Sequence, residues 1–339
     1  MRTGLFKKNT KCFGIDFGTD TIKIYKKGTG LVYVQKTAIA VKNKKTVIAI
    51  GDEAYDMYGK VPEQIEVIFP LINGVIASFD RMVSFMNCVF LDLTREIGKF
   101  YGAEFHLVVP ADLSELEKKA FYDVIDKSFI RASRVLLYDK PAVDAIGCGI
   151  DFNRTEGTLI CDIGAETTEV SAIAGGTILH SRLFKNGGKD IDDAISAGVK
   201  KNYNLIIGKK TAENCKKNVL TLLEDDDRTE KVYGIDLVDN MPKELLLTDS
   251  LARPYADEFL NSLIDNIKSV IERIPPEFAS DFYKCGITIT GGTSSIKGLE
   301  KYLKDNLKFE IKTAEDPSDT AINGLALIME GKYKLEQEV

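Results

Sequence analysis

The sequence predicts an α/β protein built from two related halves. Residues 12–24 and residues 159–173 each read as an apolar strand, a tight Asp-x-Gly turn and a β-branched return strand. Helical patterns follow each of these segments, and strands that alternate with helices imply mixed sheets. The chain has 339 residues, which is enough for about two domains of roughly 150 residues each. We therefore expect two related halves that face each other across a cleft.

The correspondence between the two segments extends to single residues. Asp16 matches Asp162, and Gly18 matches Gly164 at the same offset. In each segment the aspartate ends an apolar strand and the glycine opens the turn. A repeat of this kind predicts two equivalent loops, one in each half.

The predicted domain boundaries follow from two stretches that fit the repeated core poorly. The first half is expected to span 1–145, with a core of 1–30 and 77–145 and an inserted subdomain of 31–76. The second half is expected to span 146–339, with a core of 146–185 and 251–315, an inserted subdomain of 186–250, and a C-terminal helix at about 316–335 that returns to the first half.

Two longer helices are predicted inside these cores. Residues 112–128 begin with Asp112 and Glu115, which we interpret as a capping box before an apolar face. Residues 250–273 place apolar side chains at helical spacing and end before a Pro-Pro pair.

Composition narrows the functional classes. Apolar residues make up 44% of the chain and the net charge is −6, so nucleic acid is not the expected partner, because its binders carry basic surfaces. The six cysteines form no Cys-x-x-Cys pair and only two histidines are present, so the sequence does not predict a zinc site. No apolar run reaches the ~18 residues of a membrane span, and the N-terminus lacks the apolar stretch of a signal peptide. We expect a cytoplasmic protein.

The repeated loop has a chemistry of its own. A turn that contains glycine lets backbone N–H groups approach a phosphate closely, and an aspartate at the strand end can hold Mg²⁺ through water. A single Asp-x-Gly turn is commonly a structural hairpin, whereas two copies in register favour phosphate binding. A third loop, with Gly291 and Gly292 between a strand and a helix, suits close approach of a base or phosphate or is a plain βα turn.

At these three loops the sequence resembles the actin superfamily of ATPases, which includes actin, the sugar kinases and the seventy-kilodalton heat-shock chaperones. Within the superfamily it resembles the MreB family, and the resemblance covers nearly the whole chain. The stretches that carry this resemblance are Ile50–Ala54, Pro70–Asp80, Tyr203–Gly208, Thr211–Glu213, Asp236–Val238 and Ile274–Glu277.

The resemblance implies an actin-like fold, with a nucleotide cleft between two domains that each carry an inserted subdomain. It implies ATP and Mg²⁺ as cofactors. The residues that it assigns to the nucleotide are Gly18, Thr19, Asp20 and Thr21 in the first phosphate loop, Gly164, Ala165, Glu166 and Thr167 in the second, Gly187 and Gly188 beside the cleft, Glu213 and Lys216 at ribose and adenine, and Gly291, Gly292, Thr293 and Ser294 in the adenosine loop. The residues that it assigns to Mg²⁺ are Asp16 and Asp162.

Three departures from the family pattern affect catalysis. The second phosphate loop has Gly164-Ala-Glu-Thr167 where the family has Gly-Gly-Gly-Thr. The family's Glu-Glu-Pro, whose second glutamate orients the attacking water, is here Asp139-Lys-Pro141. The first loop is also one residue shorter than usual. The altered catalytic set is Lys140, Glu166 and Thr167, and the chain is expected to be an ATPase at most.

Three roles for Lys140 stay open at this point. In the first reading, Lys140 contacts the γ-phosphate. In the second, Lys140 pairs with Glu166. In the third, Glu166 takes over the orientation of the attacking water. An ammonium group has three donors and no acceptor, so the first two readings predict weak or absent ATP hydrolysis with binding intact.

Two functions are weighed against each other. The first is a polymerising scaffold whose filaments, as paired protofilaments, lie at the inner face of the cell membrane and set cell shape, with other MreB paralogues and cell-shape proteins as further partners. A variant is a motility or accessory filament in a cell with several MreB copies. The second is a small-molecule kinase of the same superfamily, for which the sequence offers no base beside an acceptor hydroxyl.

Two segments are candidates for membrane contact. Leu5 and Phe6 precede two lysines at the N-terminus, which gives marginal affinity per protomer that a filament multiplies. Phe90, Leu91 and Leu93 form a second apolar cluster, which is either a membrane loop or part of the core.

Overall fold

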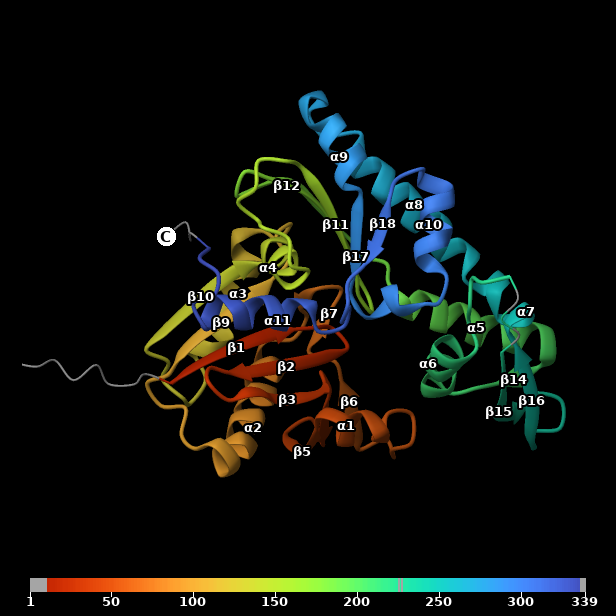
Figure 1. Cartoon of the computed structure of the whole chain (residues 1–339). Helices are drawn as coiled ribbons and strands as arrows, with labels where there is room; N and C mark the ends of the chain where they lie inside the picture. Colours follow the sequence, from red (N-terminus) through yellow and green to blue (C-terminus); the bar gives the residue numbers. More distant parts are fainter. Residues whose placement is uncertain (1–10, 225, 227, 336–339) are drawn as a thin grey trace, which may run out of the picture. The chain divides into compact units, whose positions relative to one another are not determined.

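The computed structural model, which describes residues 11–224, 226 and 228–335, divides the chain into two units (Figure 1). The first unit comprises Met1–Ile150 and Ala321–Val339, and the second comprises Asp151–Thr320. Each unit is built on a mixed five-stranded sheet.

The first unit contains a large sheet with the strand order β10-β9-β1-β2-β3, a three-stranded sheet β5-β4-β6 and the hairpin β7-β8. Its strands are β1 (Cys12–Phe17), β2 (Thr21–Lys26), β3 (Gly30–Lys36), β4 (Ile39–Lys42), β5 (Thr46–Ile50), β6 (Ile65–Ile68), β7 (Leu71–Ile72), β8 (Val75–Ile76), β9 (Glu104–Val109) and β10 (Arg134–Asp139). Its helices are α1 (Gly51–Met57), α2 (Phe79–Ile97), α3 (Glu115–Asp126), α4 (Lys140–Gly147) and α11 (Thr320–Met329).

The second unit contains a large sheet with the strand order β13-β12-β11-β17-β18 and a three-stranded sheet β14-β15-β16. Its strands are β11 (Thr158–Ile163), β12 (Thr168–Ala174), β13 (Thr177–Phe184), β14 (Leu205–Ile206), β15 (Thr229–Asp236), β16 (Pro242–Thr248), β17 (Ile287–Thr290) and β18 (Ile311–Thr313). Its α-helices are α5 (Gly188–Tyr203), α6 (Lys209–Asn218), α7 (Asp249–Ala252), α8 (Asp257–Ile271), α9 (Ala279–Cys285) and α10 (Leu299–Leu307), and its 3₁₀ helices are η1 (Arg253–Tyr255), η2 (Pro276–Phe278) and η3 (Gly292–Ser295).

The two large sheets have the same connectivity. In the first unit, β1 pairs antiparallel with β2 and parallel with β9. In the second, β11 pairs antiparallel with β12 and parallel with β17. The internal repeat predicted from the two Asp-x-Gly segments is therefore confirmed at the level of topology.

Strand alternation divides the core of the first unit between the two faces of its large sheet. Phe13 and Ile15 on β1 point into a cluster with α2 and α3. Gly14 between them leaves room on the other face, where Leu325 and Met329 of α11 lie against its backbone and pack with Val108 of β9. Figure 1 shows α11 lying along this face, opposite α2. The C-terminal helix thus completes the core of the unit that contains the start of the chain.

The core of the second unit joins its large sheet to the segment that follows β13. Leu159, Cys161 and Ile163 of β11 are fully buried in one cluster with α5, α8 and α10. The same cluster includes Leu247 at the end of β16. The inserted helices and the small sheet therefore share a core with the sheet that carries the second phosphate loop.

Two helix predictions are wrong at their boundaries. Helix α3 begins after Ser114, whose side chain accepts from Glu117 N at 3.3 Å while Ser114 N donates to Glu117 at 2.8 Å. The capping box therefore lies two residues later than predicted, at Ser114 and Glu117 instead of Asp112 and Glu115; aspartate and serine cap equally well, so residue type alone does not choose between them. The segment predicted as one helix over 250–273 is broken into α7, η1 and α8, since Pro254 lacks the N–H that a continuous helix needs.

The apolar cluster proposed as a membrane loop is largely core. Phe90 and Leu93 are buried in α2, whereas Leu91 is 54% exposed. The membrane reading is therefore wrong for Phe90 and Leu93. Leu5 and Phe6 lie outside the described residues. Within the described part of the chain, no helix has the length and apolarity needed to cross a bilayer.

Candidate functional site

The first phosphate loop connects β1 to β2 and is held from the side by the corner after β3. The hydroxyl of Thr37 donates to Gly18 O at 2.8 Å, and Thr37 N donates to Asp20 O at 2.9 Å. A Cβ at Gly18 would overlap the carbonyl oxygen of Thr21, so the turn closes as tightly as it does only with glycine. Asp16 ends the apolar run of β1 and is 8% exposed.

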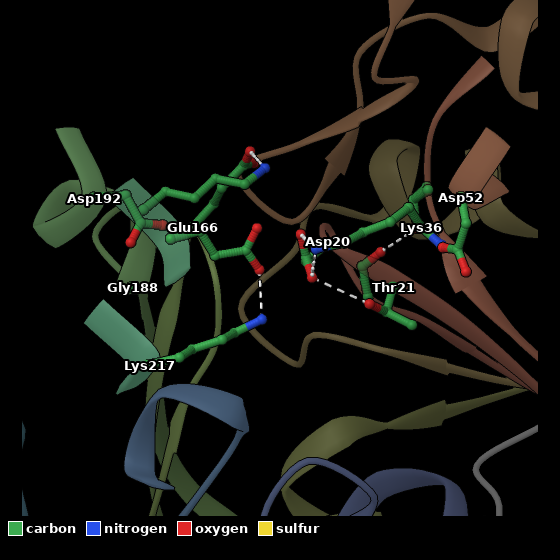
Figure 2. A network of polar contacts seen from close by, with 12 residues as sticks. Asp20, Thr21, Lys36, Asp52, Glu166, Gly188, Asp192 and Lys217 are labelled. Atoms are coloured by element: carbon green, nitrogen blue, oxygen red, sulfur yellow. Dashed lines mark hydrogen bonds and ion pairs between the residues drawn. The ribbon is translucent and has the colours of Figure 1, made fainter. Parts of the chain in front are cut away.

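The acidic side chain of this loop is neutralised within its own unit. Lys36 Nζ lies 2.8 Å from Asp20 Oδ2 and 4.6 Å from the centre of the Tyr55 ring. Lys36 N donates to Asp52 at 2.9 Å, and Thr21 Oγ1 donates to Asp20 at 3.1 Å (Figure 2). The loop is thereby tied to α1.

The second phosphate loop connects β11 to β12 and is bonded to the start of α5. Gly164 N donates to Thr167 O at 2.8 Å, which closes the turn. Gly188 N donates to Gly164 O at 3.0 Å, and Lys189 N donates to Ala165 O at 2.7 Å. The first N–H groups of a helix have no partner inside the helix, so here the phosphate loop supplies two of the missing acceptors.

The glutamate that sets this loop apart from the family pattern has a lysine partner in the same unit. Lys189 Nζ lies 2.6 Å from Glu166 Oε1, with side-chain exposures of 32% and 15% (Figure 2). Lys189 is the second residue of α5, so the segment that binds the loop through its backbone also balances the glutamate's charge.

The third loop contacts the second through side chains and a close backbone approach. Thr293 Oγ1 donates to Gly164 O at 2.7 Å, and Ser294 Oγ donates to Gly291 O at 2.7 Å. Gly291 has a φ of +83°, and a Cβ there would overlap the side chain of Asp162. Gly292 is exposed, and its Cβ would meet nothing within 4 Å. Gly291 is thus enclosed by protein, whereas Gly292 faces open space. A flat ligand could approach the backbone at Gly292.

Helix α6 reaches the same region through a buried lysine. Lys216 Nζ donates to Gly188 O at 2.8 Å and to Asp192 Oδ2 at 2.8 Å, and the Lys216 and Asp192 side chains are about one-tenth exposed. Burial raises the pKa of Asp192, and the charge of Lys216 opposes that shift. Glu213, the other residue assigned to ribose and adenine, accepts from Lys217 at 2.6 Å. The second unit therefore gathers the predicted residues of its two loops, the α5 start and α6.

Lys140 occupies the first position of α4, directly after Asp139, and is followed by Pro141. Asp139 accepts from Lys118 Nζ at 2.8 Å. Proline at the second position is compatible with the helix because its missing N–H has no helical partner there. The residue that replaces the family's water-orienting glutamate is thus fixed at a helix start.

The two strand-end aspartates suit a hard cation. Asp162 is 6% exposed and occupies in β11 the place that Asp16 occupies in β1. Mg²⁺ is usually bound through one or two carboxylates together with the phosphates of a substrate. In each unit, taken by itself, one buried carboxylate lies beside a glycine loop, and both are groups of the kind that magnesium and phosphate bind.

Sequence reasoning missed four residues that organise these loops, namely Lys36, Thr37, Lys189 and Asp192. The only available signal was position, since Lys189 directly follows the Gly187–Gly188 pair. The partners of the other three lie on elements that only the folded sheet brings to the loops.

Comparison with known proteins gives a consistent result. The family model described as MreB/Mbl protein matches residues 10–337. The chain is 32% identical to the cell shape-determining protein Mbl of Bacillus subtilis over 95% of this chain and 96% of that protein. It is 28% identical to the cell shape-determining protein MreB of Escherichia coli K12, over 95% of this chain and 93% of that protein.

Solved structures agree with these relatives. MreB5 of Spiroplasma citri bound to AMPPNP has a TM-score of 0.89 and 30% identity, with 96% of this chain and 97% of that chain covered. The MamK double helical filament has a TM-score of 0.77 at 19% identity, with 95% and 99% covered. The predicted fold class is confirmed, because both neighbours are actin-like.

Proposed function

The chain belongs to the MreB/Mbl family, and on that premise we propose that it is an ATP-binding cytoskeletal protomer that polymerises into filaments at the membrane and contributes to cell shape. One observation carries the proposal. In the second unit, the second phosphate loop bonds both to the start of α5 and to Thr293 of the third loop. Within this arrangement the backbone of Gly292 faces open space, and there we propose that the nucleotide lies.

We assign ATP with Mg²⁺ as the ligand. MreB5 of Spiroplasma citri has one solved structure bound to AMPPNP, 30% identical to this chain, and another bound to ADP, 31% identical. Asp16 and Asp162 are the carboxylates that we assign to Mg²⁺, which would neutralise charge on the phosphates. Gly291 to Ser294 are the residues that we assign to adenosine.

Hydrolysis is proposed to be slow. A protonated Lys140 cannot accept a hydrogen bond from the attacking water, and positioning of that water contributes much of the rate of phosphoryl transfer. Glu166 is held by Lys189 at 2.6 Å, which supports a structural role for this glutamate over a catalytic one. The protein is therefore expected to bind ATP and to turn it over weakly.

We place the filaments at the inner face of the cell membrane, with other copies of this chain, MreB paralogues and cell-shape proteins as partners. Leu91, which is 54% exposed on α2, is a candidate for membrane contact, together with the N-terminal residues. A motility or accessory filament is the variant of this proposal, and a small-molecule kinase of the same superfamily is the competing function.

Polymerisation is tested by electron microscopy and sedimentation of the purified protein with ATP, with ADP and without nucleotide. We expect filaments with ATP, and loss of nucleotide-dependent sedimentation in Gly292→Val, whose added side chain meets only the space for the ligand. A monomeric protein that transfers phosphate to a small acceptor in a substrate screen would instead identify a kinase.

Membrane association is tested separately by flotation of ATP filaments with liposomes that contain anionic lipid. Flotation should decrease in Leu91→Ser and after removal of residues 2–8. Leu116→Ser is the matched control, because Leu116 is another exposed leucine of the same unit, 79% exposed on α3. Equal flotation of all four proteins would show that neither Leu91 nor residues 2–8 contribute to membrane binding.

A further inference from the structure

A thiol, an imidazole and a carboxylate meet at the start of β1, the end of that strand opposite to the first phosphate loop. Cys12 begins β1 and is the direct partner of Glu104, which begins the parallel strand β9. His106 lies two residues after Glu104 and therefore on the same face of the sheet. One donor atom from each of the three side chains lies within 4.8 Å of the other two.

The imidazole is held in a fixed orientation. His106 Nε2 lies 3.0 Å from Glu104 Oε1, and His106 Nδ1 lies 2.8 Å from the hydroxyl of Tyr138. The two rings are nearly parallel, at an angle of 12° with centroids 5.4 Å apart. A histidine that binds a metal usually has its other ring nitrogen held by a hydrogen-bond partner in this way. Tyr138 therefore leaves Nε2 as the nitrogen directed at Glu104.

Charged groups of both signs surround these side chains. Burial, with Lys27 and Arg134, lowers the pKa of His106, and Glu104 opposes the shift. Burial, with Glu104 and Glu330, raises the pKa of Cys12 to about 11, and Lys27 opposes the shift.

We propose that Cys12, Glu104 and His106 form a binding site for zinc or another divalent cation of similar softness. Sulfur and imidazole ligands select such metals over Mg²⁺ and Ca²⁺. Metal bonds of about 2.0–2.3 Å in a tetrahedron place the ligand atoms roughly 3.3–3.8 Å apart. Donor atoms that now lie within 4.8 Å of one another would close by up to about 1.5 Å, and the 3.0 Å separation of His106 Nε2 and Glu104 Oε1 would open slightly.

Binding breaks one bond to hydrogen at Cys12 and one at His106, and it forms a bond to the metal at each. The S–H bond of Cys12 breaks, its proton goes to solvent, and a sulfur–metal bond forms. In the cation-free site Nε2 carries the ring proton and donates it to Glu104, while Nδ1 accepts from the Tyr138 hydroxyl. On binding, the Nε2–H bond breaks and a bond from Nε2 to the metal forms. Exchange with solvent places the ring proton on Nδ1, which then donates a hydrogen bond to the Tyr138 oxygen. The thiolate and the Glu104 carboxylate together cancel the two positive charges. Glu104 is 29% exposed, so the fourth position of the metal is open to water.

The site would cross-link β1 to β9 where β1 enters the sheet. Cys12 and Tyr138 both contact the cluster that includes α11. Metal binding therefore stabilises the first unit at a place separate from the residues that we assign to the nucleotide.

Cobalt(II) is the probe, because a cobalt–thiolate bond gives a near-ultraviolet charge-transfer band and tetrahedral cobalt gives intense visible bands. The full chain, stripped of metal, should develop both on titration with Co²⁺, and Zn²⁺ should displace the cobalt at a stoichiometry of one. Cys12→Ser should abolish the charge-transfer band, and His106→Gln should weaken binding at least tenfold. Tyr138→Phe should weaken it by about tenfold, as loss of an outer hydrogen-bond partner does.

Cys88→Ser and Cys285→Ser are the matched controls, because both thiols are half-buried and neither belongs to the cluster. Both variants should keep the band. Circular dichroism of Cys12→Ser establishes that it folds, and Zn²⁺ should raise the melting temperature of the parent but not of this variant. Absence of the band in the parent, or its persistence in a folded Cys12→Ser, overturns the proposal.

Discussion

The two phosphate loops have the same backbone plan and different side-chain environments. In both, an aspartate is the next-to-last residue of a buried strand, a glycine follows two residues later, and an acidic residue precedes the closing threonine. Asp20 in the first loop and Glu166 in the second occupy equivalent places, and each pairs with a lysine of its own unit, at 2.8 Å and 2.6 Å.

The lysines come from different elements. Lys36 ends β3, a strand of the same sheet as the first loop, whereas Lys189 lies at the start of α5. The residue directly across from the strand-end aspartate also differs, since Asp16 faces Lys23 and Asp162 faces Glu169. In both loops the close approach of backbone fixes the turn. The element that supplies the balancing lysine differs between the two loops, and so does the charge of the residue across from the aspartate.

The largest effect is expected where backbone approach is tightest. Gly291→Ala combines a positive φ with overlap of the Asp162 side chain, and should cost about 2–4 kcal/mol of unfolding free energy. Urea denaturation measures this. Gly292→Ala is the control, with open space at its Cβ, and its free energy of unfolding should change by less than about 0.5 kcal/mol. Equal stability of the two variants would mean that the third loop is not locked as described.

Removal of one strand-end carboxylate tests whether the two halves contribute alike. Asp162→Asn and Asp16→Asn should each weaken Mg²⁺–ATP binding by about ten- to a hundredfold, or roughly 1.4–2.7 kcal/mol, because a carboxylate is lost from the cation. Calorimetric titration measures the affinity. Asp305→Asn, at an exposed position of α10, should bind like the parent. A change in only one of the two variants would assign the cation to one half.

The third prediction concerns ATP turnover after the family pattern is restored at position 140 and in the second phosphate loop. Lys140→Glu combined with Glu166→Gly and Ala165→Gly should raise the rate of ATP turnover at least tenfold, which corresponds to about 1.4 kcal/mol of barrier. Phosphate release at saturating ATP measures this rate.

Two single variants test the alternative that Glu166 orients the attacking water. Robust phosphate release by the parent that Lys140→Ala leaves unchanged and Glu166→Gln abolishes would assign water orientation to Glu166. The pair with Lys189 would then be catalytic rather than structural.

The smallest effect compares the two ion pairs directly. Double-mutant cycles with Lys189→Met and Glu166→Gln, and with Lys36→Met and Asp20→Asn, should each give a coupling of about 0.5–1 kcal/mol, because the pairs are only partly buried. Both couplings should decrease in high salt. A coupling indistinguishable from zero in one loop would show that its lysine does not stabilise the turn.

Much of the fold could be read from local patterns. An apolar strand that ends in Asp-x-Gly fixes a turn within a few residues, so the repeat, the strands β1 and β11 and the positions of Asp16 and Asp162 were all predictable. The glycine pair of the third loop follows from the same kind of signal. The family resemblance added roles for residues that no local pattern identifies, such as Lys216.

The remaining features depend on contacts between distant segments. The sequence could not decide that Phe90 and Leu93 are buried while Leu91 between them is exposed, because this depends on how α2 lies on the sheet. Nor could it predict that Ser114 caps α3, since several nearby residues are acceptable caps.

The sequence by itself determined the two-fold repeat, the glycine turns and the family, since each rests on residues close together in the chain. Only the tertiary structure decided which lysine balances each loop and which side chains meet at the start of β1. Strand register sets those contacts, as when it places Cys12 beside Glu104. Register depends on the packing of the whole sheet against its helices, and for that reason no local pattern encodes it.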